Sequence, residues 1–377
     1  MIKKGILFLI ILLTMSIKTG AQMKNPKNVK QKWKTNIKKR NINLEELTIL
    51  LKRNQIPPIN NTVYISNDAV KDEFFKKEPV IVVKIDQGYY GYPISILMRH
   101  EIVNEKIGNL YYSVTYCPLC NTTIVFNREY TFNNKNYIFK FGTSGMLRKS
   151  NLVMWDENTE TWWQQFNGKG IVGTLKGKTL KRLPMMRISI KDFINNYPNG
   201  KILSKKSGYD KISVYSKNPY ANYDDIKTEK PRLFFEEVSD RLPAMERTIE
   251  VEVNGMRKIY PQSVLENVKV INDKVANKNI VLFYKKGVVS VLDKKDISKS
   301  RDIGTVVVFN PKIEEMVLEF VKNGRYFRDK QTGSKWTITG QCISGKLKDK
   351  ELNVETHSYH FAFVALSFYP DIEIYKK

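Results

Sequence analysis

The sequence has little cysteine, little histidine and few acidic residues. Three cysteines among 377 residues exclude a disulfide-dense scaffold and a pair of zinc knuckles, and three histidines exclude a histidine-rich metal cage. Asp and Glu number 38 against 63 Lys and Arg, which gives a formal net charge of +25. Because 42% of the residues are hydrophobic and 11% are aromatic, the composition is that of a folded protein and not of a disordered chain. At about 100–200 residues per domain, the length predicts two to three domains.

Long hydrophobic runs are also absent, apart from one at the N-terminus. Residues 6–17 form an apolar run that follows Lys3 and Lys4 and precedes small residues before Gln22. This pattern predicts a secretory signal peptide over residues 1–21. A helix made of this run reaches only about 18 Å, short of the roughly 30 Å hydrocarbon core of a bilayer. The sequence therefore predicts a protein exported to the periplasm or the extracellular medium, with no membrane span after signal cleavage.

Basic residues are concentrated after the predicted signal peptide, in a leader that we place at residues 22–79. Ten basic residues and two acidic ones lie between Gln22 and Arg53. Such a segment is typical of a solvated leader, and it also permits electrostatic contact with anionic surfaces. No nucleic acid is predicted as a partner, because the charge elsewhere is dispersed and no aromatic-basic reading motif is present.

Two parts of the chain repeat the same order of motifs. Tyr92-Pro93 follows a strand-like run and opens a helical pattern, and Tyr260-Pro261 does the same 168 residues later. An Asp-turn-Trp hairpin ends at Trp163 and another at Trp336. Proline suits the first turn of a helix because it has no amide hydrogen to lose, and a buried indole dominates local packing. The repeated positions therefore have a structural explanation first.

These matches predict an α+β fold of two related β-rich halves that arose by internal duplication. Each half is expected to contain strand hairpins and short helices. We place the first half at residues 80–204 and the second at residues 247–377. Residues 205–246 are polar and rich in turn formers, which predicts a linker between the halves.

The first half contains a Cys-Pro-Leu-Cys segment, Cys117 to Cys120, that the second half lacks. The strand-like runs Leu110–Tyr116 and Thr122–Phe126 flank it, which disfavours a thioredoxin-type pair at the start of a helix. Two thiolates in a turn can chelate zinc together with further ligands, or copper with fewer. The side chains that can supply further ligands are Cys342, His100, His357 and His360. Two alternatives stay open: a reactive thiol pair, and a structural disulfide, which contributes only about 2 kcal/mol by closing so short a loop.

A second segment, Phe141 to Asn151, also differs between the halves. We predict a polar loop here that binds a small ligand through backbone amides and side chains, those of Ser144, Arg148 and Asn151. The alternative is a surface loop that only joins two strands. A hydrolase that uses Ser144 is disfavoured, because the nucleophile-elbow motif needs glycine where Met146 stands. The counterpart in the second half, residues 311–324, is predicted to be helical.

The motifs together resemble a known family. Tyr-Cys-Pro-Leu-Cys at 116–120, Phe-Gly-Thr-Ser-Gly at 141–145 and Thr-Trp-Trp-Gln-Gln at 161–165 closely resemble the bacterial domain-of-unknown-function 3179 family, as do the motifs from 327 to 370. The resemblance spans about residues 80–375. It implies an exported or envelope-associated protein and carries no activity. His360 departs from the family, whose members tend to have an aromatic residue there.

The sequence thus predicts an exported protein that binds a soft metal ion or acts through a thiol pair at Cys117 and Cys120, beside a polar ligand loop. Copper and zinc are the candidate ions, and an unidentified small ligand is the candidate partner. The alternative is a non-enzymatic envelope scaffold or ligand-binding module in which the two cysteines form a structural disulfide.

Overall fold

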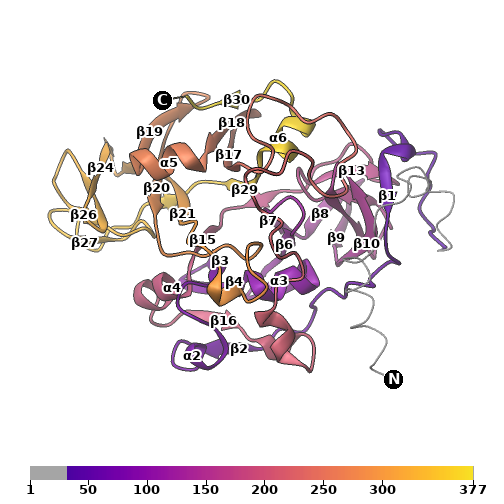
Figure 1. Ribbon diagram of the computed structural model, residues 1–377, viewed down its shortest axis with the longest axis horizontal. Coiled ribbons are helices and arrows are strands. Elements are labelled where there is room, and N and C mark those ends of the chain that lie inside the picture. Colours follow the sequence, from indigo (N-terminus) through magenta and orange to yellow (C-terminus); the bar gives the residue numbers. More distant parts are fainter. Residues whose placement is uncertain (1–31, 377) are drawn as a thin grey trace.

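The computed structural model describes residues 32–376. Strands dominate this part of the chain and the helices are few and short (Figure 1), which confirms the predicted β-rich character. The predicted signal peptide and the first residues of the predicted leader lie outside the described residues. Within residues 32–376, no helix is both long enough and apolar enough to span a bilayer.

The first half begins with two hairpins joined by a helix. β3 (Pro79–Ile85) pairs with β4 (Gly88–Pro93), and β5 (Ile102–Ile107) pairs with β6 (Leu110–Cys117), which in turn pairs with β7 (Thr122–Asn127). The helix α3 (Ile94–His100) begins directly after Pro93 and ends at Glu101, whose φ is 59°. The near-continuous β-branched and aliphatic residues of β3 are almost all buried, as expected of a strand covered on both faces.

The second half begins with the same arrangement. β17 (Arg247–Val253) pairs with β18 (Met256–Pro261), and β19 (Val270–Val275) pairs with β20 (Lys278–Lys285), which pairs with β21 (Thr305–Asn310). The helix α5 (Gln262–Val268) begins after Pro261 and ends at Lys269, whose φ is 68°. A long excursion, residues 286–304, joins β20 to β21, whereas only residues 118–121 join β6 to β7 in the first half.

Each half continues into shorter strands and a last helix. The first half contains β8 (Glu129–Phe132), β9 (Lys135–Ile138), β10 (Phe141–Arg148), β11 (Asn151–Asp156), β12 (Trp162–Gln164), β13 (Lys169–Val172), β14 (Arg182–Leu183), β15 (Met186–Ser189), α4 (Ile190–Asn196) and β16 (Lys201–Leu203). The second half contains β22 (Lys312–Ile313), β23 (Met316–Val317), β24 (Phe320–Asn323), β25 (Tyr326–Asp329), β26 (Lys335–Trp336), β27 (Cys342–Ser344), β28 (Asn353–Val354), β29 (His357–Phe361), α6 (Ala362–Phe368) and β30 (Glu373–Ile374).

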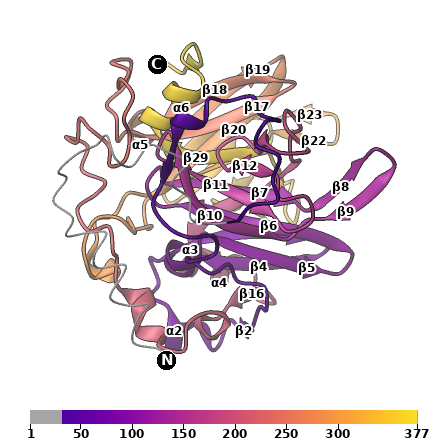
Figure 2. The same cartoon turned by 90° about the vertical axis from the view of Figure 1, so that its right-hand side faces the viewer.

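The largest sheet crosses from one half to the other. Its strand order is β30-β18-β17-β29-β7-β6-β5, and Tyr359 of β29 pairs with Thr123 of β7. Conversely, β15 of the first half lies beside β21 of the second, where the Thr305 hydroxyl donates to the Arg187 carbonyl. The small sheets β10–β13 and β24–β27 lie at opposite ends of the molecule in Figure 1, and the hairpin β8–β9 projects from the body in Figure 2. The halves therefore share a core and are not separate domains.

The two Asp-turn-Trp hairpins make the same hydrogen bonds. The indole Nε1 of Trp163 donates to Asp156 Oδ2 at 2.9 Å, and that of Trp336 donates to Asp329 Oδ2 at 2.9 Å. In each hairpin the other carboxylate oxygen accepts from the backbone amide three residues on, at 2.6 Å. Both indoles are fully buried. These aspartates therefore hold turns and indoles in place, which is the structural explanation expected from the sequence.

Residues 32–79 pack onto the fold. β1 (Leu47–Ile49), which follows the short 3₁₀ turn η2 (Leu44–Glu46), pairs with β10, and β2 (Tyr64–Ser66) pairs with β16. The short helix α2 (Val70–Glu73) follows. The ring of Trp33 meets those of Trp155 and Trp162 edge-on, with centroids 5.7 and 5.3 Å apart. Burial of these apolar side chains explains why this basic segment lies on the body of the protein.

Residues 205–246 contain only two 3₁₀ turns, η3 (Lys205–Ser207) and η4 (Ile212–Ser216), and no strand or α-helix. The prediction of a helix at residues 311–324 was wrong, because this segment contains the strands β22, β23 and β24. Ile313 pairs with Met316 in a tight hairpin, and Glu314 in its turn has a φ of 53°. A positive φ is incompatible with a right-handed helix at that point.

Candidate functional site

The Cys-Pro-Leu-Cys segment is the turn of a β-hairpin. Cys117 is the last residue of β6 and is paired with Thr122, the first residue of β7. Asn121 closes the turn with a φ of 52°, and its amide donates to the Pro118 carbonyl at 3.3 Å. The turn brings the Sγ atoms of Cys117 and Cys120 to 3.0 Å from each other. Both residues are free thiols.

The neighbouring β10–β11 hairpin supplies polar atoms to both sulfurs. The Ser150 carbonyl oxygen lies 3.8 Å from Cys117 Sγ and 3.6 Å from Cys120 Sγ, and it accepts from both thiols. Asn151 Nδ2 donates to Cys120 Sγ at 3.0 Å. Lys149 and Ser150 both have positive φ, so the tight turn between β10 and β11 is what directs this carbonyl at the sulfurs.

Asn151 is itself held in a buried amide network. Its Nδ2 also donates to Gln165 Oε1 at 2.9 Å, and its Oδ1 accepts from Gln164 Nε2 at 2.7 Å. Gln165 Nε2 donates in turn to Thr115 Oγ1 at 2.9 Å. Asn151 and both glutamines are completely buried. Because such a network fixes each member's orientation, the Asn151 donor is preorganised toward Cys120.

Burial dominates the electrostatics of the thiols. Cys117 is 1% exposed and Cys120 is inaccessible. Burial raises the pKa of the Cys117 thiol well above its usual value, and the neighbouring Cys120 sulfur raises it further. Burial also raises the pKa of the Glu101 carboxyl, and the charge of Cys117 adds to that effect. Burial thus favours the neutral, protonated form of the Cys117 thiol.

The segment between the halves covers the turn. The Tyr223 hydroxyl donates to the Leu119 carbonyl at 2.6 Å, and the Ser150 hydroxyl donates to the Arg232 carbonyl at 2.8 Å. From the second half, the Phe361 amide donates to the Cys120 carbonyl at 2.9 Å. These contacts lie over the turn, and both sulfurs are buried beneath them.

The predicted ligand loop is not a loop. Residues 141–156 form the paired strands β10 and β11, with a bulge between Thr143 and Met146. Gly145 permits the bulge, since its φ is 78° and a Cβ there would lie 2.0 Å from the Leu51 carbonyl oxygen. Of the three predicted ligand-binding residues, only Asn151 lies at the thiols.

Ser144 and Arg148 have other partners. The buried Ser144 hydroxyl donates to the Val153 carbonyl at 2.5 Å and accepts from the Met146 amide at 3.0 Å. Both contacts belong to the bulge of the sheet. Arg148 forms an ion pair with Glu46 at 2.6 Å and lies over the Phe368 ring. No base is hydrogen-bonded to Ser144 in the described residues, so the geometry gives no support to the hydrolase alternative.

The predicted additional metal ligands are dispersed. Over residues 32–376, no group of three or more His, Cys, Asp and Glu side chains is placed to hold a metal ion. His100 contacts the Pro57 carbonyl and the Tyr215 hydroxyl, while His357 contacts the Glu355 carbonyl and the Tyr359 hydroxyl. Among the cysteines and histidines of residues 32–376, only Cys117 and Cys120 lie together. A four-ligand zinc site made by this chain alone therefore does not fit the side chains present.

Sequence reasoning missed Tyr223 and the Asn151–Gln165 network. Tyr223 lies in the predicted linker, 104 residues from its partner Leu119, and no local pattern marks it. The repeated glutamines of Thr-Trp-Trp-Gln-Gln were a usable signal, because two adjacent amides beside two tryptophans on a short strand must find buried partners.

Comparison with known proteins gives one match. A family model described as a protein of unknown function (DUF3179) matches residues 53–372. No curated protein and no solved structure matches the chain.

Proposed function

The chain belongs to the DUF3179 family, and from the geometry of its hairpin turn we propose that it acts as a dithiol–disulfide protein through Cys117 and Cys120. The observation that carries the proposal is the 3.0 Å separation of the two sulfurs. A third thiol, Cys342, is also buried; within the described part of the chain it lies beside neither of the other cysteines, and it contacts the Ser344 carbonyl at 3.5 Å. It serves as a reference within the same chain.

The reaction is a two-electron exchange with an oxidant that itself carries a disulfide. One thiol of the pair loses its proton and attacks a sulfur of that disulfide, which releases one thiolate of the oxidant and forms a mixed disulfide. The second thiol then loses its proton and attacks its partner, which forms the intramolecular bond and releases the other thiolate. The two protons pass to the two released thiolates, so the pair is oxidised and the oxidant is reduced.

Asn151 and the covering segment have separate roles in this proposal. The Asn151 amide stabilises developing negative charge on Cys120 because a hydrogen bond to a charged acceptor is stronger than one to a neutral group. The raised pKa of Cys117 keeps that thiol unreactive while it is buried. Opening of the cover is then the step that controls reactivity.

Export is part of the proposal. A signal peptide at residues 1–21 would deliver the chain to a compartment in which disulfides persist, where a pair that cycles needs a reductant as well as an oxidant. The excess of basic residues, +25 over the full sequence, favours contact with anionic surfaces of the envelope.

A redox titration tests the proposal. The protein is equilibrated in glutathione buffers of stated potential, quenched with acid, alkylated and weighed by mass spectrometry. We expect Cys117 and Cys120 to lose two hydrogens together, reversibly, with a midpoint between about −300 and −120 mV. Cys117→Ser and Cys120→Ser abolish the transition, and Cys342→Ser leaves it unchanged. A cysteine pair that stays reduced at every potential would contradict redox cycling. A disulfide bond that strong reductant cannot open would also contradict it, and would instead establish a structural disulfide and a scaffold role.

A second candidate is a soft monovalent metal ion such as Cu(I), held by the same two sulfurs. The Asn151 donor to Cys120 Sγ supports it, since thiolate ligands are commonly oriented by outer hydrogen bonds, and Cu(I) can be bound by few ligands. Elemental analysis separates the candidates: one copper per chain that is lost in the Cys117→Ser/Cys120→Ser double variant supports the metal, and metal-free protein that titrates supports the dithiol.

We also propose that the two halves descend from one duplicated unit. The same order of strands, the helices that start after Pro93 and Pro261, and the matching indole–aspartate bonds support this. The carboxylates of Glu78 and Glu246, 168 residues apart, are also both bound by a serine at the start of the following helix. In this proposal the ancestral turn kept its two sulfurs in one half and became the excursion 286–304 in the other.

A further inference from the structure

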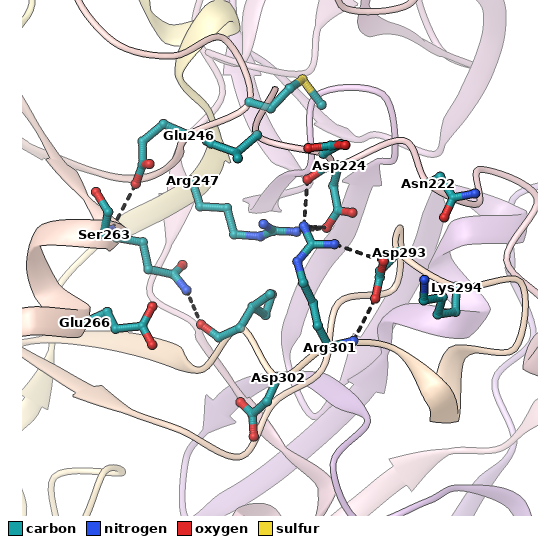
Figure 3. A pocket seen from close by; sticks show the side chains of 15 residues that line it. Asn222, Asp224, Glu246, Arg247, Ser263, Glu266, Asp293, Lys294, Arg301 and Asp302 are labelled. Atoms are coloured by element: carbon teal, nitrogen blue, oxygen red, sulfur yellow. Dashed lines mark hydrogen bonds and ion pairs between the residues drawn. The ribbon is translucent and has the colours of Figure 1, made fainter. Parts of the chain in front are cut away.

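The excursion that replaces the cysteine turn in the second half forms a cavity of about 540 Å³. Its wall combines four separate segments: residues 222–226 of the segment between the halves, 245–247 at the start of β17, 262–266 of α5, and 293–303 of the excursion. The volume lies within the roughly 300–1,000 Å³ typical of small-molecule sites. Figure 3 shows side chains from all four segments turned toward the same space.

The sign of charge in this cavity is opposite to that of the chain. Three basic residues line it, Arg247, Lys294 and Arg301. Six acidic residues line it as well: Asp224, Asp225, Glu246, Glu266, Asp293 and Asp302. In a protein with 63 basic and 38 acidic residues, a wall with twice as many acids as bases is a local reversal.

The two arginines are already neutralised within the wall. Arg247 forms an ion pair with the inaccessible carboxylate of Asp224, and Arg301 pairs with Asp224 at 2.9 Å and with Asp293 at 3.0 Å. In Figure 3 the two guanidiniums converge on Asp224, while Glu246 and Glu266 lie on the opposite side. Both guanidiniums are therefore paired within the wall, and Lys294 is the remaining basic side chain that lines it.

Glu246 forms no ion pair within residues 32–376, and the charge of Arg247 and hydrogen bonds from Ser263 and Gln262 compensate it only in part. It is only 9% exposed, and its Oε1 accepts from the Ser263 amide at 2.9 Å. Burial raises the pKa of its carboxyl. By contrast, Glu266 and Asp302 have partners outside the wall, Lys286 at 3.1 Å and Lys77 at 3.2 Å.

Buried acceptors without donors are present in the same wall. Asp224 Oδ1 and Gln262 Oε1 are both buried, and neither has a hydrogen-bond partner within the described part of the chain. Gln262 is 5% exposed, and its Nε2 donates to the Ile303 carbonyl at 2.6 Å, which fixes the orientation of the amide. A buried acceptor without a partner costs about 1–3 kcal/mol. These atoms therefore favour a ligand that brings N–H donors.

We propose that this cavity binds a small organic cation that carries two or more ammonium groups on an aliphatic chain. Ammonium N–H groups would satisfy Glu246 and the Gln262 acceptor, and the methylene spacers would lie against Ile226, Met245 and Ile303, which supply the apolar part of the wall. A single metal ion does not fit, because the acids surround a space and no three of them converge within residues 32–376. The proposal does not depend on the dithiol function.

The test is a calorimetric titration of the full chain with spermidine. A strongly basic protein repels polycations in general, so saturable one-to-one binding must come from a local acidic site. We expect binding that weakens with added salt. We also expect Glu246→Gln to weaken it by about tenfold or more, since it removes one charged hydrogen bond. The matched control is Glu229→Gln, an exposed acid of the same segment outside the cavity, and it should leave affinity unchanged.

Each other outcome overturns the proposal. The same titration is repeated with inorganic phosphate in place of spermidine. Binding of phosphate but not of spermidine would show that Arg247 and Arg301 form an anion-binding site. Equal loss in Glu246→Gln and Glu229→Gln, or no loss in either, would place spermidine elsewhere on the surface. If Glu246→Gln does not fold by circular dichroism, the half-exposed Glu266→Gln carries the same comparison, and unchanged affinity there overturns the proposal too.

Discussion

Removal of the Tyr223 hydroxyl should expose Cys117 and Cys120 more often, because Tyr223 belongs to the segment that lies over their turn. Tyr223 is 2% exposed, and its hydroxyl donates to the Leu119 carbonyl at 2.6 Å and also interacts with the Arg232 backbone. Tyr223→Phe keeps the ring over the turn, including its edge-on packing against Phe361 at 6.2 Å. A net hydrogen bond contributes about 1 kcal/mol, with a range of about 0.5–1.5, so the open form should become about fivefold more populated, within a range of about two- to thirteenfold.

The assay is the rate of alkylation of each cysteine by a maleimide at pH 7.5, followed by mass spectrometry of peptides. When the cover recloses faster than the reagent reacts, the rate is proportional to the open population. We expect Cys117 and Cys120 to react about fivefold faster in the variant, with Cys342 unchanged as the internal reference. Tyr209→Phe, at a 39% exposed position of the same segment, is the matched control. Unchanged rates at the pair, or an equal rise at Cys342, would refute the assignment of Tyr223 as part of the cover.

Three further results are expected from denaturation and pH. Trp163→Phe and Trp336→Phe should each lower the free energy of unfolding in urea by a similar amount, about 1.5–3 kcal/mol, because each removes an indole donor to a buried carboxylate; a large inequality would weaken the duplication proposal. Glu250→Gln should lower it by about 3–5 kcal/mol, because it leaves the guanidiniums of Arg182 and Arg257 short of their buried counter-charge. Burial lowers the pKa of His357 to about 4, so the unfolded chain, with a histidine pKa near 6.5, binds the proton more readily; stability should fall by about 2 kcal/mol from pH 7.5 to pH 5 on this account, and urea midpoints of His357→Gln should show a correspondingly flatter pH profile.

The parts of the fold that could be predicted are those that local sequence determines. The strands on either side of the cysteines were placed within one residue, since β6 ends at Cys117 and β7 begins at Thr122. Both are β-branched and aromatic runs bounded by a proline-containing turn, which is a strong strand signal. The helices after Tyr92-Pro93 and Tyr260-Pro261 were also predicted from local sequence, because a proline marks the start of each.

The errors arose where tertiary packing overrides a local pattern. Gly-Thr-Ser-Gly was interpreted as a loop, but Gly145 only permits a bulge inside β10. The segment 311–324 has helix-like spacing, yet Phe320 packs edge-on against Phe283 and Trp336, with centroids 5.0 and 5.6 Å apart. Phe320 makes those contacts from strand β24, and the turn at Glu314 belongs to the preceding hairpin of β22 and β23. Propensity is a weak prior against such burial.

The two candidate sites were harder to predict than the fold, because each joins residues that are far apart along the chain. Cys120 and the Asn151 amide are 31 residues apart, and they meet only because two hairpin turns face each other. The acidic cavity draws on segments more than 60 residues apart along the sequence, none of which carries a motif. Global composition pointed the other way: a charge of +25 predicts affinity for anions. Net charge is a sum over the whole surface, whereas a ligand in a partly enclosed space responds mainly to the groups within a Debye length, about 8–10 Å. A basic protein can therefore have a cavity lined mainly by acidic residues, and composition alone does not determine the charge of a local site.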